Sequence, residues 1–134
     1  MPNQADTADE LRRYLNARIP LIVLRTSEAR RAQELIRQVA GQLKAMSFYC
    51  HTRTGGLAEL LSQKAIVDDR SLLGAFDYAA ATFRSRDYVN FVFVDVEDIG
   101  DDSSTSRHLA ELADLAENRS GSIILITAGS VSTG

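Results

Sequence analysis

The sequence predicts an α/β domain, a three-layer sandwich in which helices cover both faces of a mostly parallel sheet. First, short unbroken apolar runs such as Leu21–Leu24 are typical of strands buried on both faces. Second, these runs alternate with segments of helical periodicity, as parallel sheets require. Third, 134 residues with 45% hydrophobic and 25% charged side chains can bury one core. We therefore expect a single domain over residues 1–134.

The bounds of the first helix and the first strand are predicted from residues that start or stop a helix. Thr7 and Glu10 have the spacing of a capping box, which predicts an N-terminal helix over 7–18. Pro20 should end this helix, because proline cannot continue the helical hydrogen bonding. The apolar run 21–24 follows directly and is the first expected strand.

The rest of the chain continues the same alternation, which gives a core over 20–128 and a tail over 129–134. Thr26 or Ser27 should cap a second helix that ends near Lys44. The elements expected after it are a strand over 46–51, a turn at Thr54-Gly55-Gly56, a short helix around 57–61, a loop through Val67, a helix capped by Asp69 or Ser71, a strand over 91–94, a helix with the apolar face 109–116 and a fourth strand over 123–126.

This order of elements suggests a P-loop-NTPase-like topology, truncated after the fourth strand. The P-loop strand order is 5-1-4-3-2, and no fifth strand is visible before Gly134. The first strand should then lie at an edge of the sheet with unpaired backbone groups. We expect it to pair either with chain beyond Gly134 in a longer parent or with a second copy.

Charge and composition exclude several classes of function. The net charge of −3 and the pI of about 5.3 argue against a general nucleic-acid binder. Residues 1–64 carry 10 Lys and Arg against 6 Asp and Glu, whereas 65–134 carry 5 against 12, which suggests polar faces for protein partners. The sequence has neither a membrane-spanning apolar run nor a signal peptide, so a cytoplasmic location is expected. Cys50 is alone and is expected to be a buried small hydrophobe.

Ligands of open parallel sheets bind where strands end, so the residues after the first strand are informative. A nucleotide-binding domain would place a glycine-rich phosphate loop there, with Lys and Ser or Thr. The chain instead reads Arg25-Thr26-Ser27-Glu28, without glycine or lysine. Glu28 adds negative charge at a helix N-terminus, which repels phosphate. We therefore expect no ATP hydrolysis and no cofactor, with Arg25, Thr26 and Ser27 as the weak candidates for a degenerate nucleotide site.

Acidic residues follow the third strand. Asp95 ends an apolar run, as the Mg²⁺-holding acid of nucleotide hydrolases does, but Val96 stands where a catalytic carboxylate would follow. Asp95, Glu97 and Asp98 thus have three interpretations: a solvated loop, a weak divalent-metal site, or a remnant Mg²⁺ position that still works. His51 and His108 have no neighbour at metal-ligand spacing, and no nucleophile motif is present, so the chain is not expected to be an enzyme by itself.

Several segments resemble AAA ATPases of the cyanobacterial and chloroplast-encoded type. The segments that carry the resemblance are 11–28, Thr54-Gly55-Gly56-Leu57, 73–78 and Phe93-Val94-Asp95, and the similarity as a whole covers about 11–128. In those proteins a degenerate N-terminal domain without Walker A precedes a true AAA domain. The resemblance implies a regulatory or scaffolding module of a larger ATPase, whose partner is another protein or the downstream ATPase domain.

Two other functions remain open at this point. Val94-Asp95 and 124–128 look like the third and fourth strands of a response receiver, although Arg25-Thr26 stands where a receiver needs an acid pair. A nucleotide-binding domain that uses Asp95 and Arg25 without a P-loop is the other alternative. The first hypothesis remains a non-catalytic interaction module, with a homo-oligomer as one of its forms.

Overall fold

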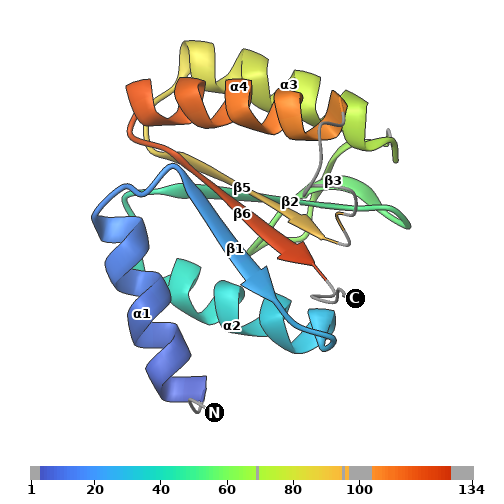
Figure 1. Ribbon diagram of the computed structural model, residues 1–134. Helices are drawn as coiled ribbons and strands as arrows, with labels where there is room; N and C mark the ends of the chain where they lie inside the picture. Colours follow the sequence, from blue (N-terminus) through green and yellow to red (C-terminus); the bar gives the residue numbers. More distant parts are fainter. Residues whose placement is uncertain (1–3, 69, 95, 97–103, 128–134) are drawn as a thin grey trace, which may run out of the picture.

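The computed structural model describes residues 4–68, 70–94, 96 and 104–127, and it has the expected three layers. A six-stranded sheet lies between α1 and α2 on one face and α3 and α4 on the other (Figure 1). The elements are α1 (Gln4–Asn16), β1 (Leu21–Arg25), α2 (Ala29–Gln42), β2 (Ser47–Thr52), β3 (Gly56–Glu59), β4 (Ala65–Val67), α3 (Leu72–Ser85), β5 (Val89–Val94), α4 (Ser104–Asn118) and β6 (Ser122–Thr127). The predicted fold class is confirmed.

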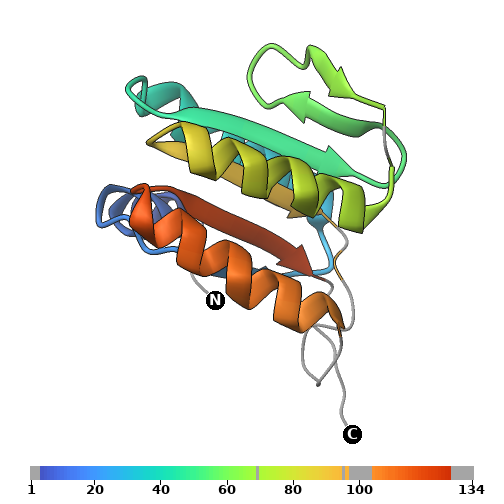
Figure 2. The same cartoon turned by 90° about the horizontal axis from the view of Figure 1, so that it is seen from above.

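The sheet has the order β1-β6-β5-β2-β3-β4. The four strands predicted from the sequence are β1, β2, β5 and β6, and they are parallel to one another in the expected order, with β1 at an edge. β3 and β4 extend the opposite edge as antiparallel strands. Figure 2 shows this hairpin projecting at one side of the sheet. The sheet therefore has two strands more than the sequence predicted.

The β3–β4 hairpin corrects two predictions. Residues 56–59 form β3, where a short helix around 57–61 was expected, and 65–67 form β4, where a loop was expected. Pairing with β2 overrides the helix preference of the Leu-Ala-Glu-Leu-Leu segment. Gly56 permits the entry into β3, because its φ is +73°.

The ends of the helices also differ from the predictions. α1 begins at Gln4, so Thr7 lies within the helix and does not cap it. It ends before Pro20: Arg18 has a left-handed backbone (φ 58°), and the N–H of Ile19 donates to the carbonyl of Tyr14 at 3.1 Å, as in a Schellman motif. α2 has Glu28 as its N-cap instead of Thr26 or Ser27. At α3 the expected cap is confirmed, since Ser71 Oγ accepts from the N–H of Gly74 at 3.0 Å.

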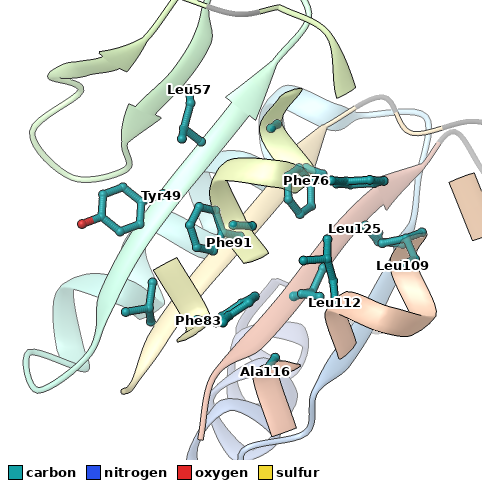
Figure 3. Close-up of a cluster of buried hydrophobic side chains, with 14 of the residues drawn as sticks. Tyr49, Leu57, Phe76, Phe83, Phe91, Leu109, Leu112, Ala116 and Leu125 are labelled. Carbon is teal, nitrogen blue, oxygen red and sulfur yellow. The ribbon is translucent and has the colours of Figure 1, made fainter. Parts of the chain in front are cut away.

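Two apolar cores hold the layers together. One lies under α3 and α4 and is rich in aromatic side chains, with Phe76 edge-on to Phe93 at 4.9 Å and Phe83 edge-on to Phe91 at 5.3 Å between ring centroids (Figure 3). The other lies under α1 and α2 and contains Ile22 of β1. All the buried residues that β1 contributes are on this second side.

Candidate functional site

The four parallel strands point in one direction, so their carboxyl ends lie along one margin of the sheet (Figure 1). Ligands of open parallel sheets bind at this margin. β1 ends there at Arg25, β2 at Thr52 and β6 at Thr127. Asp95, Glu97 and Asp98 lie outside the described residues, so the proposed metal position after β5 stays a prediction.

The connection from β1 to α2 is short and internally hydrogen bonded. It consists of the three residues Thr26, Ser27 and Glu28. The N–H of Thr26 donates to the carbonyl of Thr127 at 2.8 Å, and the N–H of Glu28 donates to Thr26 Oγ1 at 3.0 Å. A phosphate loop needs several successive backbone N–H groups that point into an open cradle. In this connection, the N–H groups of Thr26 and Glu28 are already used within the protein.

Charges at the start of α2 partly cancel. Glu28 lies at the N-cap, is exposed, and does not use its side chain to cap the helix. Its carboxylate lies 3.4 Å from the guanidinium of Arg31, and both side chains are more than half exposed. Such an exposed pair contributes little to stability. It does place a carboxylate where the helix dipole would otherwise favour a phosphate.

Val96 is the one described residue just after β5, and it is fully buried. Its side chain belongs to the aromatic-rich core, and its N–H donates to the carbonyl of Ile126 at 3.4 Å. In nucleotide hydrolases a catalytic carboxylate follows the metal-holding acid directly. Here that position is part of the hydrophobic core.

The two histidine rings lie beside aromatic side chains, and the cysteine is buried. The ring of His51 packs 6.4 Å from Phe93 and that of His108 packs 6.2 Å from Phe76, measured between centroids. Within the described part of the chain, no group of three or more His, Cys, Asp or Glu residues is placed to hold a metal ion. Burial raises the pKa of the Cys50 thiol to about 11, and the nearby charge of Arg37 lowers it by less. A thiol with such a pKa is a poor nucleophile at neutral pH.

A comparison with protein families identifies the family of this chain. A family model described as "SpoVK-like AAA ATPase, N-terminal domain" matches residues 7–132. The chain belongs to this family. No curated protein and no solved structure matches the chain.

The open edge of this AAA ATPase N-terminal domain is its second candidate site. In the described structure β1 pairs with β6 on one side, and no strand lies on the other. The carbonyl of Pro20 accepts from Ile123 and the N–H of Thr26 donates to Thr127. Because hydrogen-bonding direction alternates along a strand, even-numbered residues face β6, and the backbone groups of Leu21, Val23 and Arg25 face outward.

The side chains at this edge are apolar and partly exposed. Leu21 is 36% and Val23 37% exposed, and both lie on the sheet face that α3 and α4 cover. Tyr14 of α1 and Ile19 of the following turn are 41% and 39% exposed. The sequence predicted the position of this strand at an edge. Which backbone groups of this strand face outward could not be predicted, because that depends on the register between β1 and β6, which only the structure gives.

None of the described helices is long and apolar enough to cross a membrane. The described residues offer two places for function: the carboxyl margin, where the β1–α2 connection has no glycine and no lysine, and the β1 edge, whose outward backbone groups could pair with another strand.

Proposed function

We propose that this domain is a non-catalytic interaction module of an AAA ATPase, of the type found at the N-terminus of the cyanobacterial and chloroplast-encoded enzymes. The match to the N-terminal domain of SpoVK-like AAA ATPases supports the AAA ATPase part of this proposal. Within the larger protein it mediates oligomerisation or docking to a protein partner, and the ATPase activity belongs to another domain.

The observation that carries this proposal is the connection from β1 to α2. A Walker A loop spans eight residues of the pattern G-x-x-x-x-G-K-[ST]. Here three residues without glycine or lysine join the strand to the helix, and a carboxylate stands at the helix start. Without a backbone cradle or a lysine, the β- and γ-phosphates have nothing to bind.

The receiver alternative is not favoured by the topology. Flavodoxin-like domains, which include receivers, have the strand order 2-1-3-4-5, with the first strand inside the sheet. In this domain β1 lies at the edge. A degenerate nucleotide site at Arg25 and Asp95 stays the second candidate, because Arg25 is exposed at the carboxyl margin.

Calorimetric titration of the domain with ATP, ADP and Mg²⁺ tests the proposal. We expect no heat of binding up to millimolar nucleotide. A dissociation constant tighter than about 100 μM would overturn the proposal. Loss of that binding in Arg25→Ala, with the fold intact by circular dichroism, would then favour the degenerate nucleotide site instead.

A further inference from the structure

We propose that the open edge of β1 binds the β1 edge of a second copy of this domain, antiparallel, about a two-fold axis that passes beside Val23. This inference names the partner of the interaction module proposed above and rests on that function. It is carried by the register of β1, by the side chains that flank it, and by the position of an acidic residue on α4.

The backbone of β1 is self-complementary about Val23. The residues whose N–H and C=O groups face outward are Leu21, Val23 and Arg25, which are spaced symmetrically about the middle one. In an antiparallel pair centred there, Val23 exchanges both hydrogen bonds with its own copy, and Leu21 exchanges both with Arg25 of the second copy. Every outward backbone group of the strand then has a partner.

The side chains fit the same register. In an antiparallel pair, directly opposed residues lie on one face of the sheet. Val23 therefore packs on Val23 of the second copy, and Leu21 packs against the aliphatic part of Arg25. Opposed valines suit a strand pair, and the two arginines lie at opposite ends of the joint, so like charges do not meet.

The outer side of α4 supplies the complementary charge. His108 of α4 packs beside Phe76 of α3 with 6.2 Å between ring centroids, which fixes the side of α4 that faces α3. Helical periodicity turns the opposite side, with Ala113 and Glu117, toward the β1 edge.

Glu117 lies near the end of α4, level with the start of β6 and hence with Leu21, its neighbour in the sheet. Arg25 of one copy, opposed to Leu21 of the other, thus comes beside Glu117 of that second copy. The two-fold axis repeats this ion pair, so each joint contains it twice.

A third element borders the same edge. Arg12 of α1 donates to Gln42 of α2 at 2.8 Å, so this side of α1 faces α2. Tyr14, 41% exposed, lies on the side of α1 away from α2 and therefore toward the open edge. The pair of α1 helices would bury these two tyrosines on the other face of the joined sheet.

Light scattering after size exclusion, from about 1 μM to about 1 mM chain, measures the association. We expect a monomer at the low end and a dimer at the high end. Val23→Lys should weaken the dimer about ten-fold or more, since an edge lysine is a common device against strand pairing. Its matched control is Ile66→Lys in the middle of β4, the other edge strand, where the replaced side chain is 38% exposed against 37% for Val23. That variant should dimerise like the wild type.

A charge swap tests the register. Arg25→Glu and Glu117→Arg should each weaken the dimer, and the double variant should recover it. Failure of the double variant to recover while both single variants fold, as judged by circular dichroism, would overturn the two-fold register.

Hydrogen exchange separates the alternatives. In the dimer the amides of Leu21, Val23 and Arg25 should exchange slowly, and in Val23→Lys the amides of the other two should exchange quickly, while Ile22 and Leu24 stay protected in both. A monomer at every concentration with the three odd amides slow would show that another part of the same chain covers the edge. A monomer with those amides fast would show that the edge binds no second copy. Either result overturns this inference, whereas the nucleotide titration tests the absence of catalysis independently.

Discussion

The two edges of the sheet are built differently. β4 is three residues long, its register against β3 is interrupted between Leu57 and Ala58, and exposed Lys64 immediately precedes it. β1 is five residues long and runs in unbroken register with β6. Short strands, irregularities and lysines are the devices by which proteins prevent edge pairing. One edge of this domain therefore has these protections, and the other lacks them.

The two edge strands also differ in how far along the sequence their neighbours in the sheet lie. β3 and β4 are consecutive in sequence and close the sheet locally as a hairpin. β1 is the first strand, and the strand order places it next to β6, which is the last described strand. The β4 edge is thus formed by a local hairpin, while the β1 edge is next to a strand that is far away in the sequence.

The largest expected effect contrasts proline at two adjacent positions of β1. Ile22→Pro removes an N–H that faces β6 and a side chain that is 5% exposed, so it should cost more than about 4 kcal/mol and prevent stable folding. Val23→Pro removes an N–H that faces outward, so it should cost only about 1 kcal/mol at low protein concentration. Urea unfolding followed by circular dichroism measures the cost of Val23→Pro, and the circular dichroism spectrum without urea shows whether Ile22→Pro folds at all.

Equal destabilisation by the two prolines would contradict the assigned hydrogen-bonding direction of β1. A larger loss from Val23→Pro than from Ile22→Pro would remove the basis of the two-fold pairing, because the outward groups would then belong to the even-numbered residues.

The next effect concerns the protected edge. Gly56 has φ +73°, and a Cβ there would lie 2.6 Å from the carbonyl oxygen of Val67 in β4. Gly56→Ala should therefore cost about 2–3 kcal/mol and loosen β4. Gly41→Ala is the matched control: a Cβ at Gly41 meets nothing within 4 Å, and this residue lies within α2, so the change should stabilise by about 0.5–1 kcal/mol. Thermal unfolding that shows the same sign for both would be incompatible with this account.

Sequence reasoning recovered the parallel strands because each is a nearly continuous apolar run, which few other structures require. It missed β3 because Leu57-Ala58-Glu59 carries no strand pattern of its own, and this segment becomes a strand only by pairing with β2. The N-cap of α2 was missed for a related reason. Thr26 does accept a backbone hydrogen bond, but from Glu28, one residue before the helix begins.

Part of the candidate site could likewise be predicted from the sequence, and part could not. The absence of a phosphate loop after β1 could be read from Arg25 to Glu28 alone, since the required residue types are missing. The orientation of the β1 backbone groups could not be predicted from the sequence. It depends on which residue of β6 lies opposite each residue of β1, and a shift of one residue reverses the orientation. The position of Glu117 beside the edge likewise needs the packing of α4 on α3.

Cys50 offers a probe of the region between the two edges, on β2 beside β3. Burial raises its pKa from 9.0 to about 11, so the folded protein retains the thiol proton at a pH where the unfolded chain loses it. The protonated thiol therefore contributes to the free energy of unfolding below pH 9.0. This contribution, about 2 kcal/mol, is lost as the pH rises toward about 11. Urea unfolding of wild type and Cys50→Ala across this range should give curves that converge at high pH. Parallel curves would place the thiol in contact with water, on a β2 strand more open than described.

The smallest effect links association to stability. If β1 pairs with a second copy, the folded state is stabilised by mass action, and well above the dissociation constant each ten-fold rise in protein concentration adds roughly 0.7 kcal/mol per chain. The midpoint of thermal unfolding should therefore rise with concentration for the wild type and for Ile66→Lys, but stay constant for Val23→Lys. Differential scanning calorimetry at three concentrations measures this dependence. A rise shared by all three proteins would locate the association at some other surface, because the lysine at Val23 disturbs only the open edge. A rise lost in both lysine variants would instead mean that the β4 edge also takes part, and the protection attributed to its short, irregular strand would be wrong.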